Sequence, residues 1–186
     1  ETTDRIMAEK ALARSEERLS LALSGSSLVG TWDWNIGDNI VTSDDKFAAM
    51  YGIDPLRAGL GVPIEAFMEA IHADDRAHVQ QDIAAVMSNA SPLQSEYRLT
   101  SADGSIRWVI ASGSPRLDAE GRPVRLPGVV VDITEQRRIS EALAESELLF
   151  RTLTDTMPQM VWSTLADGFH DYYNARWYEF TGVPVG

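Results

Sequence analysis

The chain has 186 residues, of which 44% are hydrophobic and 24% charged, a composition typical of a globular protein with enough apolar side chains for a core. Its net charge of −12 disfavours nucleic acid and anionic lipid as partners. The absence of cysteine excludes disulfides, thiolate metal sites and thiol chemistry, and no apolar run approaches the ~20 residues of a membrane span. We expect a cytoplasmic domain, internal to a longer protein that could itself be membrane-anchored.

Residues 2–22 contain neither proline nor glycine and are rich in Ala, Glu and Arg, which predicts a helix. Apolar and small residues recur along it at spacings of four and three, which indicates a weak coiled-coil seam through Leu12 and Leu19. We therefore expect residues 1–18 to form a linker helix in front of a domain at residues 19–133.

Residues 29–42 predict two short strands joined by a turn. Ser43 or Asp44 can cap the helix that follows, which carries Phe47 and Met50. This helix is expected to end at the next glycine.

A loop is expected over residues 53–63, because this stretch contains two prolines and two glycines. Residues 64–71 predict a short helix that carries Phe67. Asp74 is expected to cap a longer helix, with Ile83 on its apolar face.

The hydrophobic period then changes from 3.6 to 2. Tyr97 lies on the first of three alternating strands, Trp108 and Ile110 on the second, and residues 124–131 form the third. Short turns join these strands, which predicts an antiparallel meander. Strands on both sides of several helices predict an α+β domain with one apolar sheet face covered by the helices.

The chain also contains a long-range repeat. The sequence ALARSE at residues 11–16 returns as ALAESE at 142–147, and downstream, at a spacing shorter by one residue, Trp32 matches Trp162. The period is too long for a solenoid unit and fits a domain plus its linker.

We therefore predict a tandem array of one domain type. In this array, residues 134–148 form a linker helix and residues 149–186 begin a second copy. The second copy is expected to stop before its three-stranded meander.

Five motifs, in the order of the predicted elements, resemble the PAS domain family: GTWDW, HADDR, EYRL, DGSIRW and GVVVDITEQR. The resemblance covers roughly residues 19–137. It implies the PAS fold, a five-stranded antiparallel sheet with short helices on one face, flanked by long helical linkers.

The DITE motif has capping-box spacing, so that Asp132 can cap a helix while Glu135 reaches back to its amide. In PAS domains, the resemblance implies, this segment also couples the last strand to an output helix. The expected signal junction is Asp132, Ile133, Thr134 and Glu135.

From Thr134 the chain runs without proline or glycine to Met157, with apolar residues again at spacings of four and three. This seam predicts a homodimer through the helical linkers. The expected seam residues are Leu12, Leu19, Ile139, Leu143 and Phe150.

Large apolar residues on opposing elements define a candidate ligand pocket. Simple core packing is the favoured alternative for the aromatic residues among them. The candidate residues are Trp32, Trp34, Phe47, Met50, Phe67, Ile83, Tyr97, Trp108 and Ile110.

Cofactor chemistry is restricted by the residue inventory. The histidines lack metal-ligand spacing, and His78 lies about 100° from the inward-facing Val79, which disfavours haem. Without cysteine, the covalent flavin adduct of light-sensing PAS domains is excluded, whereas non-covalent flavin or another small ligand stays open. No catalytic constellation is found, so the sequence leaves open whether the parent is an enzyme.

The resemblance implies a sensory or relay module of a multidomain signalling protein. A histidine kinase of a two-component system is the first expectation for the output, and a diguanylate cyclase the second. The competing interpretation is a scaffold that dimerises and spaces other domains without binding a ligand.

Overall fold

The structure is a computed structural model, and it describes residues 28–184. The chain divides after Thr134 into two compact units. The expected linker helix at 1–18, with Leu12 and Leu19, lies outside the described residues.

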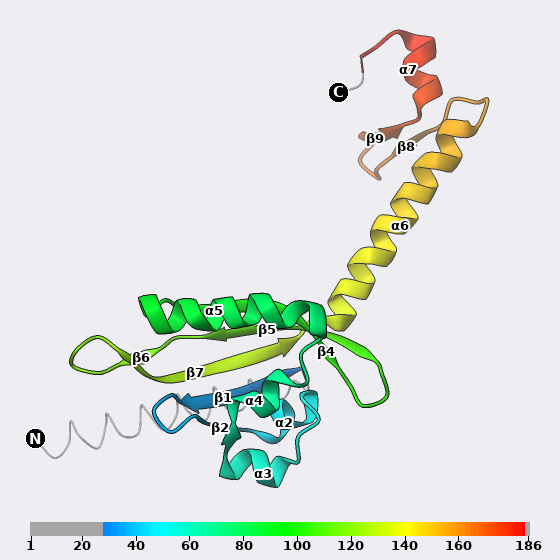
Figure 1. Cartoon of the computed structure of the whole chain (residues 1–186). Coiled ribbons are helices and arrows are strands. Elements are labelled where there is room, and N and C mark those ends of the chain that lie inside the picture. The colour runs from blue at the N-terminus through cyan, green and yellow to red at the C-terminus, as the bar shows by residue number, and fades with distance from the viewer. Residues whose placement is uncertain (1–27, 185–186) are drawn as a thin grey trace, which may run out of the picture. The chain divides into compact units, whose positions relative to one another are not determined.

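The first unit is built on an antiparallel sheet (Figure 1). Its longer strands follow one another in the spatial order β2 (Ile40–Ser43), β1 (Val29–Asn35), β7 (Pro123–Asp132), β5 (Ile106–Gly113) and β4 (Leu93–Thr100). Two short strands complete it, with β3 (Val62–Pro63) beside β2 and β6 (Arg116–Leu117) beside β7. The predicted α+β class and the meander of β4, β5 and β7 are confirmed.

Helices supply the other side of the core. They are α2 (Asp45–Met50), α3 (Pro55–Leu60), α4 (Ile64–Met68) and α5 (Arg76–Asn89), with a 3₁₀ turn at Ala73–Asp75. Figure 1 shows α5 along the side of the sheet that holds β4 and β5, and α2 to α4 gathered near β1 and β2. Buried apolar side chains from both layers form one cluster between them.

Residues 55–60 form helix α3, so the expectation of a loop over the whole of 53–63 was wrong. Asp54 caps this helix by accepting a hydrogen bond from the Arg57 amide at 3.0 Å. Pro55 occupies the first helical turn, where a backbone N–H has no acceptor within the helix, so the missing N–H of proline costs no hydrogen bond. The prolines and glycines of this stretch therefore mark the ends of a helix as well as a loop.

Strand β5 faces the core with the opposite set of side chains from the one expected. Val109 and Ala111 are buried, whereas Trp108 and Ile110 are half-buried on the other face. Tyr97 of β4 pairs with Val109 on the neighbouring strand β5, and this pairing decides which side chains of β5 face the core. Alternation gave the period correctly but not the face, because apolar residues stand in both alternating sets of β5.

Two glycines make room for close contacts in the core. A Cβ at Gly30 would lie 2.6 Å from the backbone nitrogen of Phe47, at the point where α2 crosses β1. A Cβ at Gly128 would overlap the ring of Trp32, its cross-strand neighbour. The glycine of the GTWDW motif is therefore required by helix–sheet packing.

A buried ion pair ties the start of α5 to β4. Asp75 is 8% exposed, and its carboxylate accepts hydrogen bonds from the Arg98 amide (2.8 Å), Nε (2.8 Å) and Nη2 (2.6 Å). These bonds from Arg98 lower the pKa of Asp75 to about 2. Asp74, the expected helix cap, instead donates its amide to Nδ1 of His72.

The Asp75 pKa predicts a pH-dependent stability. Because the folded pKa lies below the ordinary value of 3.8, the stabilisation is complete above about pH 4 and is lost as pH falls towards 2. We expect Asp75→Asn to lower the free energy of unfolding at pH 6 by about 1–2 kcal/mol, allowing for solvent screening. Urea unfolding of both proteins between pH 2 and 6 should show the difference narrowing below pH 4. A difference independent of pH would contradict this assignment.

The second unit contains most of helix α6 (Thr134–Thr156), then strands β8 (Trp162–Thr164) and β9 (His170–Tyr173) and helix α7 (Ala175–Thr181). Its two strands and short helix follow the same order as β1, β2 and α2.

The two units also share a specific hydrogen-bond pattern. In the first, Asp44 caps α2 through the Phe47 amide, and its carboxylate also accepts from the Thr31 amide. In the second, Asn174 accepts from the amides of Trp177 and Val161 in the same way. These positions match at the predicted spacing, which supports the internal repeat.

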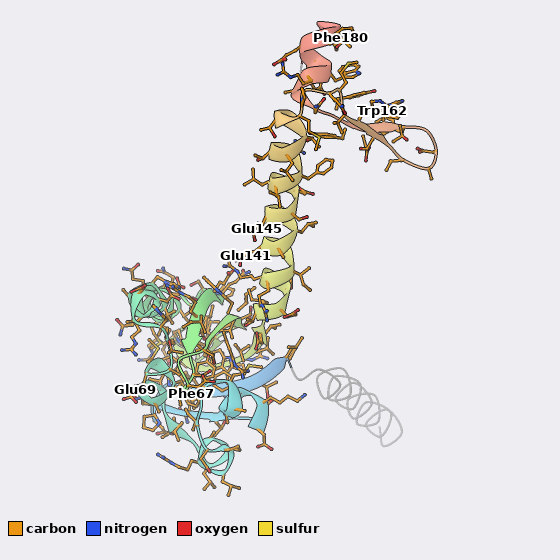
Figure 2. All side chains as sticks on the ribbon, turned by 90° about the vertical axis from the view of Figure 1, so that its right-hand side faces the viewer. Phe67, Glu69, Glu141, Glu145, Trp162 and Phe180 are labelled. Carbon is orange, nitrogen blue, oxygen red and sulfur yellow. The ribbon has the colours of Figure 1, made fainter. Side chains whose placement is uncertain are left out.

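The repeat has no counterpart of β4, β5 and β7 within residues 135–184. Trp162 is accordingly 56% exposed, whereas Trp32, its equivalent, is 8% exposed. Phe180 is exposed as well. Figure 2 labels these two side chains, Trp162 and Phe180.

Candidate functional site

A small cavity of about 50 Å³ lies in the core of the first unit, between the sheet and the helices. Six of the expected pocket residues line it: Trp32, Trp34, Phe47, Phe67, Ile83 and Tyr97. Phe67, on α4, is labelled in Figure 2. The lining also includes Tyr51, Ser95 and Ala111, which sequence reasoning did not single out.

Three expected pocket residues do not line the cavity. Trp108 and Ile110 point to the other face of the sheet, where the Arg98 guanidinium lies 5.5 Å from the Trp108 ring. Met50 is buried but lines an open groove beside α3 and the β4–β5 turn.

Two tyrosines provide the most distinctive polar feature of the cavity. The hydroxyls of Tyr51 and Tyr97 share a short hydrogen bond, and both side chains are buried. The Tyr51 ring stacks on Phe47 with centroids 4.4 Å apart and meets Phe67 edge-on at 5.6 Å. Burial raises the pKa of Tyr97 to about 12 and that of Tyr51 well above its ordinary value, so both hydroxyls are protonated at neutral pH.

Three further side chains with polar atoms line the cavity. Trp34 donates its Nε1–H to Asn39 Oδ1 at 3.3 Å, and Ser95 donates its hydroxyl to Asp82 at 2.6 Å. The Trp32 side chain is buried, and its Nε1 has no hydrogen-bond acceptor among the described residues. The polar groups of the cavity are therefore all uncharged, and the Trp32 indole is a donor without an acceptor.

The arrangement supplies binding groups rather than a set of reacting groups. His78 does not line the cavity, and its Nε2 lies 3.0 Å from the Glu96 carbonyl oxygen. Among residues 28–184, no three His, Cys, Asp or Glu side chains are grouped so that they could hold a metal ion.

The end of β7 and the start of α6 form a compact hydrogen-bonded junction. Asp132 Oδ1 accepts from the Thr134 amide (2.9 Å) and from its hydroxyl (2.6 Å). The Thr134 hydroxyl oxygen in turn accepts from the Trp108 amide of β5 at 2.9 Å. The Ile133 amide donates to the Trp108 carbonyl oxygen at 2.9 Å, so two strands hold the first residue of the helix.

The capping box expected at this junction does not form. The Asp132 amide, which Glu135 was expected to satisfy, donates to the Leu28 carbonyl oxygen at 2.8 Å. Glu135 instead lies 3.6 Å from Arg138, one helical turn ahead. Because α6 begins at Thr134, Asp132 stands one residue too early for the box and caps the Thr134 amide instead.

Helix α6 exposes its apolar residues. The expected seam residues Ile139, Leu143 and Phe150 are 61%, 61% and 48% exposed, although the Phe150 ring also contacts Tyr172. In the part of the chain that the structure describes, α6 and the shorter helices lack the length and apolarity needed to cross a membrane.

The fold resembles a solved crystal structure of a sensory box histidine kinase/response regulator from Burkholderia thailandensis. The two are 30% identical, with a TM-score of 0.59, and the match covers 73% of this chain and 98% of that one. The chain belongs to the PAS domain family. The family model described as PAS fold matches residues 40–130.

This PAS sensor domain is homologous to regions of much longer proteins. It is 33% identical over 138 residues to the probable diguanylate cyclase DgcE of Escherichia coli, and 38% identical over 114 residues to the uncharacterized protein y4lL of Sinorhizobium fredii. The matches cover 74% and 61% of this chain. They span 12% and 14% of the relatives' lengths.

Proposed function

We propose that this PAS domain senses a ligand or partner and passes the change through the Asp132–Glu135 junction to α6, and from there to an output domain. The observation that carries the proposal is the bond between the Thr134 hydroxyl and the Trp108 amide. It joins the first residue of α6 to strand β5, and Ala111, farther along that strand, lines the cavity. Displacement of β5 would therefore act on the helix directly.

Such a relay requires two arrangements of the junction that differ by a small free energy. Substitution of Asp132 tests this requirement. It removes the acceptor that holds Thr134 in place without touching the cavity. Signal output of the full-length protein should change while the core stays folded.

The relatives support two kinds of output. One is named a sensory box histidine kinase/response regulator and the other a probable diguanylate cyclase. We propose a multidomain, cytoplasmic signalling protein with a histidine kinase output, as in a two-component system, and keep a cyclase output as the alternative. The cavity favours a sensor over a ligand-free scaffold, because a scaffold has no need of internal space.

The exposed seam of α6 supports a homodimer. Ile139 and Leu143 lie four positions apart, on one side of the helix, and both are more than half exposed. A second copy of the helix would cover them in the coiled-coil manner. We propose that the PAS domain dimerises through α6, so that a change at the junction alters how two helices pair.

Leu143→Glu is expected to weaken this dimer strongly. Burial of one leucine contributes about 2 kcal/mol, so the dissociation constant should rise about thirtyfold or more. Glu141→Gln is the matched control, because Glu141 is an exposed residue outside the seam and should leave the constant unchanged (Figure 2). Sedimentation equilibrium measures both. A wild type that is monomeric at micromolar concentration would contradict the proposed dimer.

A further inference from the structure

Two hydrogen-bond donors in the cavity lack an acceptor among the described residues. The Tyr51 and Tyr97 hydroxyls carry two protons, and the bond between them uses one. The second hydroxyl proton and the Trp32 Nε1–H have no acceptor among the described residues. Buried donors are rarely left unpaired, so the cavity calls for a molecule that supplies an acceptor.

The charge of that molecule is restricted by the lining. None of the side chains that line the cavity carries a charge. The raised pKa of Tyr97, about 12, shows how strongly this environment disfavours a negative charge. An anion would lose its hydration here and gain no cation in return.

Its size is restricted as well. The cavity has a volume of about 50 Å³. An apolar cavity of about 150 Å³ accommodates benzene, which has six heavy atoms, so this one has room for a molecule of about two or three heavy atoms. The tyrosine pair and the aromatic side chains around it leave no space for a large ring system in the present arrangement.

We propose that the cavity binds a small, neutral molecule of about two or three heavy atoms with a hydrogen-bond acceptor, such as acetaldehyde, which the Tyr51–Tyr97 pair recognises. The indole N–H of Trp32, whose side chain lines the cavity, is a second unpaired donor. This inference rests on the proposed function, since it takes the cavity to be the sensory site.

Three probes of three heavy atoms each test the proposal on the whole chain: acetaldehyde, formate and propene. Acetaldehyde is neutral with an acceptor, formate is an anion, and propene has no acceptor. The NMR resonance of the Trp32 indole N–H, identified by its absence in Trp32→Phe, reports binding. We expect acetaldehyde to shift it saturably with a Kd of roughly 1–100 mM. Propene should bind about fivefold more weakly, and formate at least about tenfold more weakly.

The double variant Tyr51→Phe/Tyr97→Phe is the matched control. Removing both hydroxyls leaves no orphaned partner, so the fold should persist. The preference for acetaldehyde over propene should fall below about twofold. The proposal is overturned if formate or propene binds as tightly as acetaldehyde, if no probe shifts the wild-type resonance, or if the double variant keeps the full preference. None of these outcomes decides whether Asp132 variants change output, so the proposed function stands or fails separately.

Discussion

Gly30→Ala is expected to lower the free energy of unfolding by about 3 kcal/mol or more. The added methyl group would lie within 2.6–2.8 Å of the Phe47 backbone and Cβ atoms. Backbone atoms cannot move aside as the end of a flexible side chain can, so α2 must shift away from β1. Because Phe47 lines the cavity, the same shift should also disturb ligand binding.

Gly59→Ala is the matched control. Gly59 lies in α3, and a Cβ there would meet no atom within 4 Å. Alanine should therefore leave stability unchanged or raise it by up to about 1 kcal/mol, because it favours the helix more than glycine does. Urea unfolding of both variants measures the difference. If Gly30→Ala stayed within about 1 kcal/mol of wild type, the account of helix–sheet packing would be wrong.

Asp132→Ala is expected to change signal output several-fold with a small loss of stability. It removes the acceptor for the Thr134 amide and hydroxyl, which costs about 1 kcal/mol as the loss of a helix cap does. A domain stable by roughly 5–15 kcal/mol tolerates that loss. A tenfold population shift needs only about 1.4 kcal/mol, so the same loss is sufficient to bias a two-state junction.

Asp132→Asn separates the hydrogen bonds from the charge. Asparagine keeps an oxygen that accepts from Thr134, but it loses the charge that faces Arg107 Nη1 at 3.6 Å. Since the Arg107 side chain is about half exposed (47%), its attraction is screened and contributes little. Output of Asp132→Asn should therefore stay close to wild type. An output as altered as that of Asp132→Ala would assign the effect to the charge.

The order of strands and helices was predictable from periodicity and turn residues, because each element has its own local pattern. The face of β5 was not, since Trp108 and Ile110 are as apolar as Val109 and only cross-strand pairing decides between them. Helix α3 was missed because its proline and glycine also fit a loop, although Asp54 before Pro55 is a helix-start signal that was present.

Polar contacts between residues far apart in the sequence were even harder to predict, because local patterns do not identify the two partners. Asp75 stands next to Asp74 at a helix start, and nothing near it in the sequence points to its partner Arg98, which lies 23 positions away. The Tyr51–Tyr97 pair joins residues 46 positions apart. At the junction, Asp132 was predicted to belong to the signal path. The hydrogen bond from the Trp108 amide to the Thr134 hydroxyl was not predicted, because it depends on β5 and β7 lying side by side.

The internal repeat was the most informative feature of the sequence. At the spacing that matches Trp32 with Trp162, Asp44 corresponds to Asn174, and both side chains accept from the amides at equivalent positions. Asn174 additionally donates to the Thr154 and Gln159 carbonyl oxygens, which a carboxylate cannot do. The substitution therefore adds contacts to the end of α6 in the second unit.

The most direct test of the relay is output plotted against stability for two variants of the full-length protein. Val86→Ala is the comparison for Asp132→Ala, because Val86 is 1% exposed on α5 and lines neither the cavity nor the junction. Its loss of packing should cost about 2 kcal/mol, more than Asp132→Ala costs. The account predicts that Asp132→Ala changes output more while losing less stability. If both variants fall on one line of output against stability, the junction has no special role and Asp132 is only a helix cap.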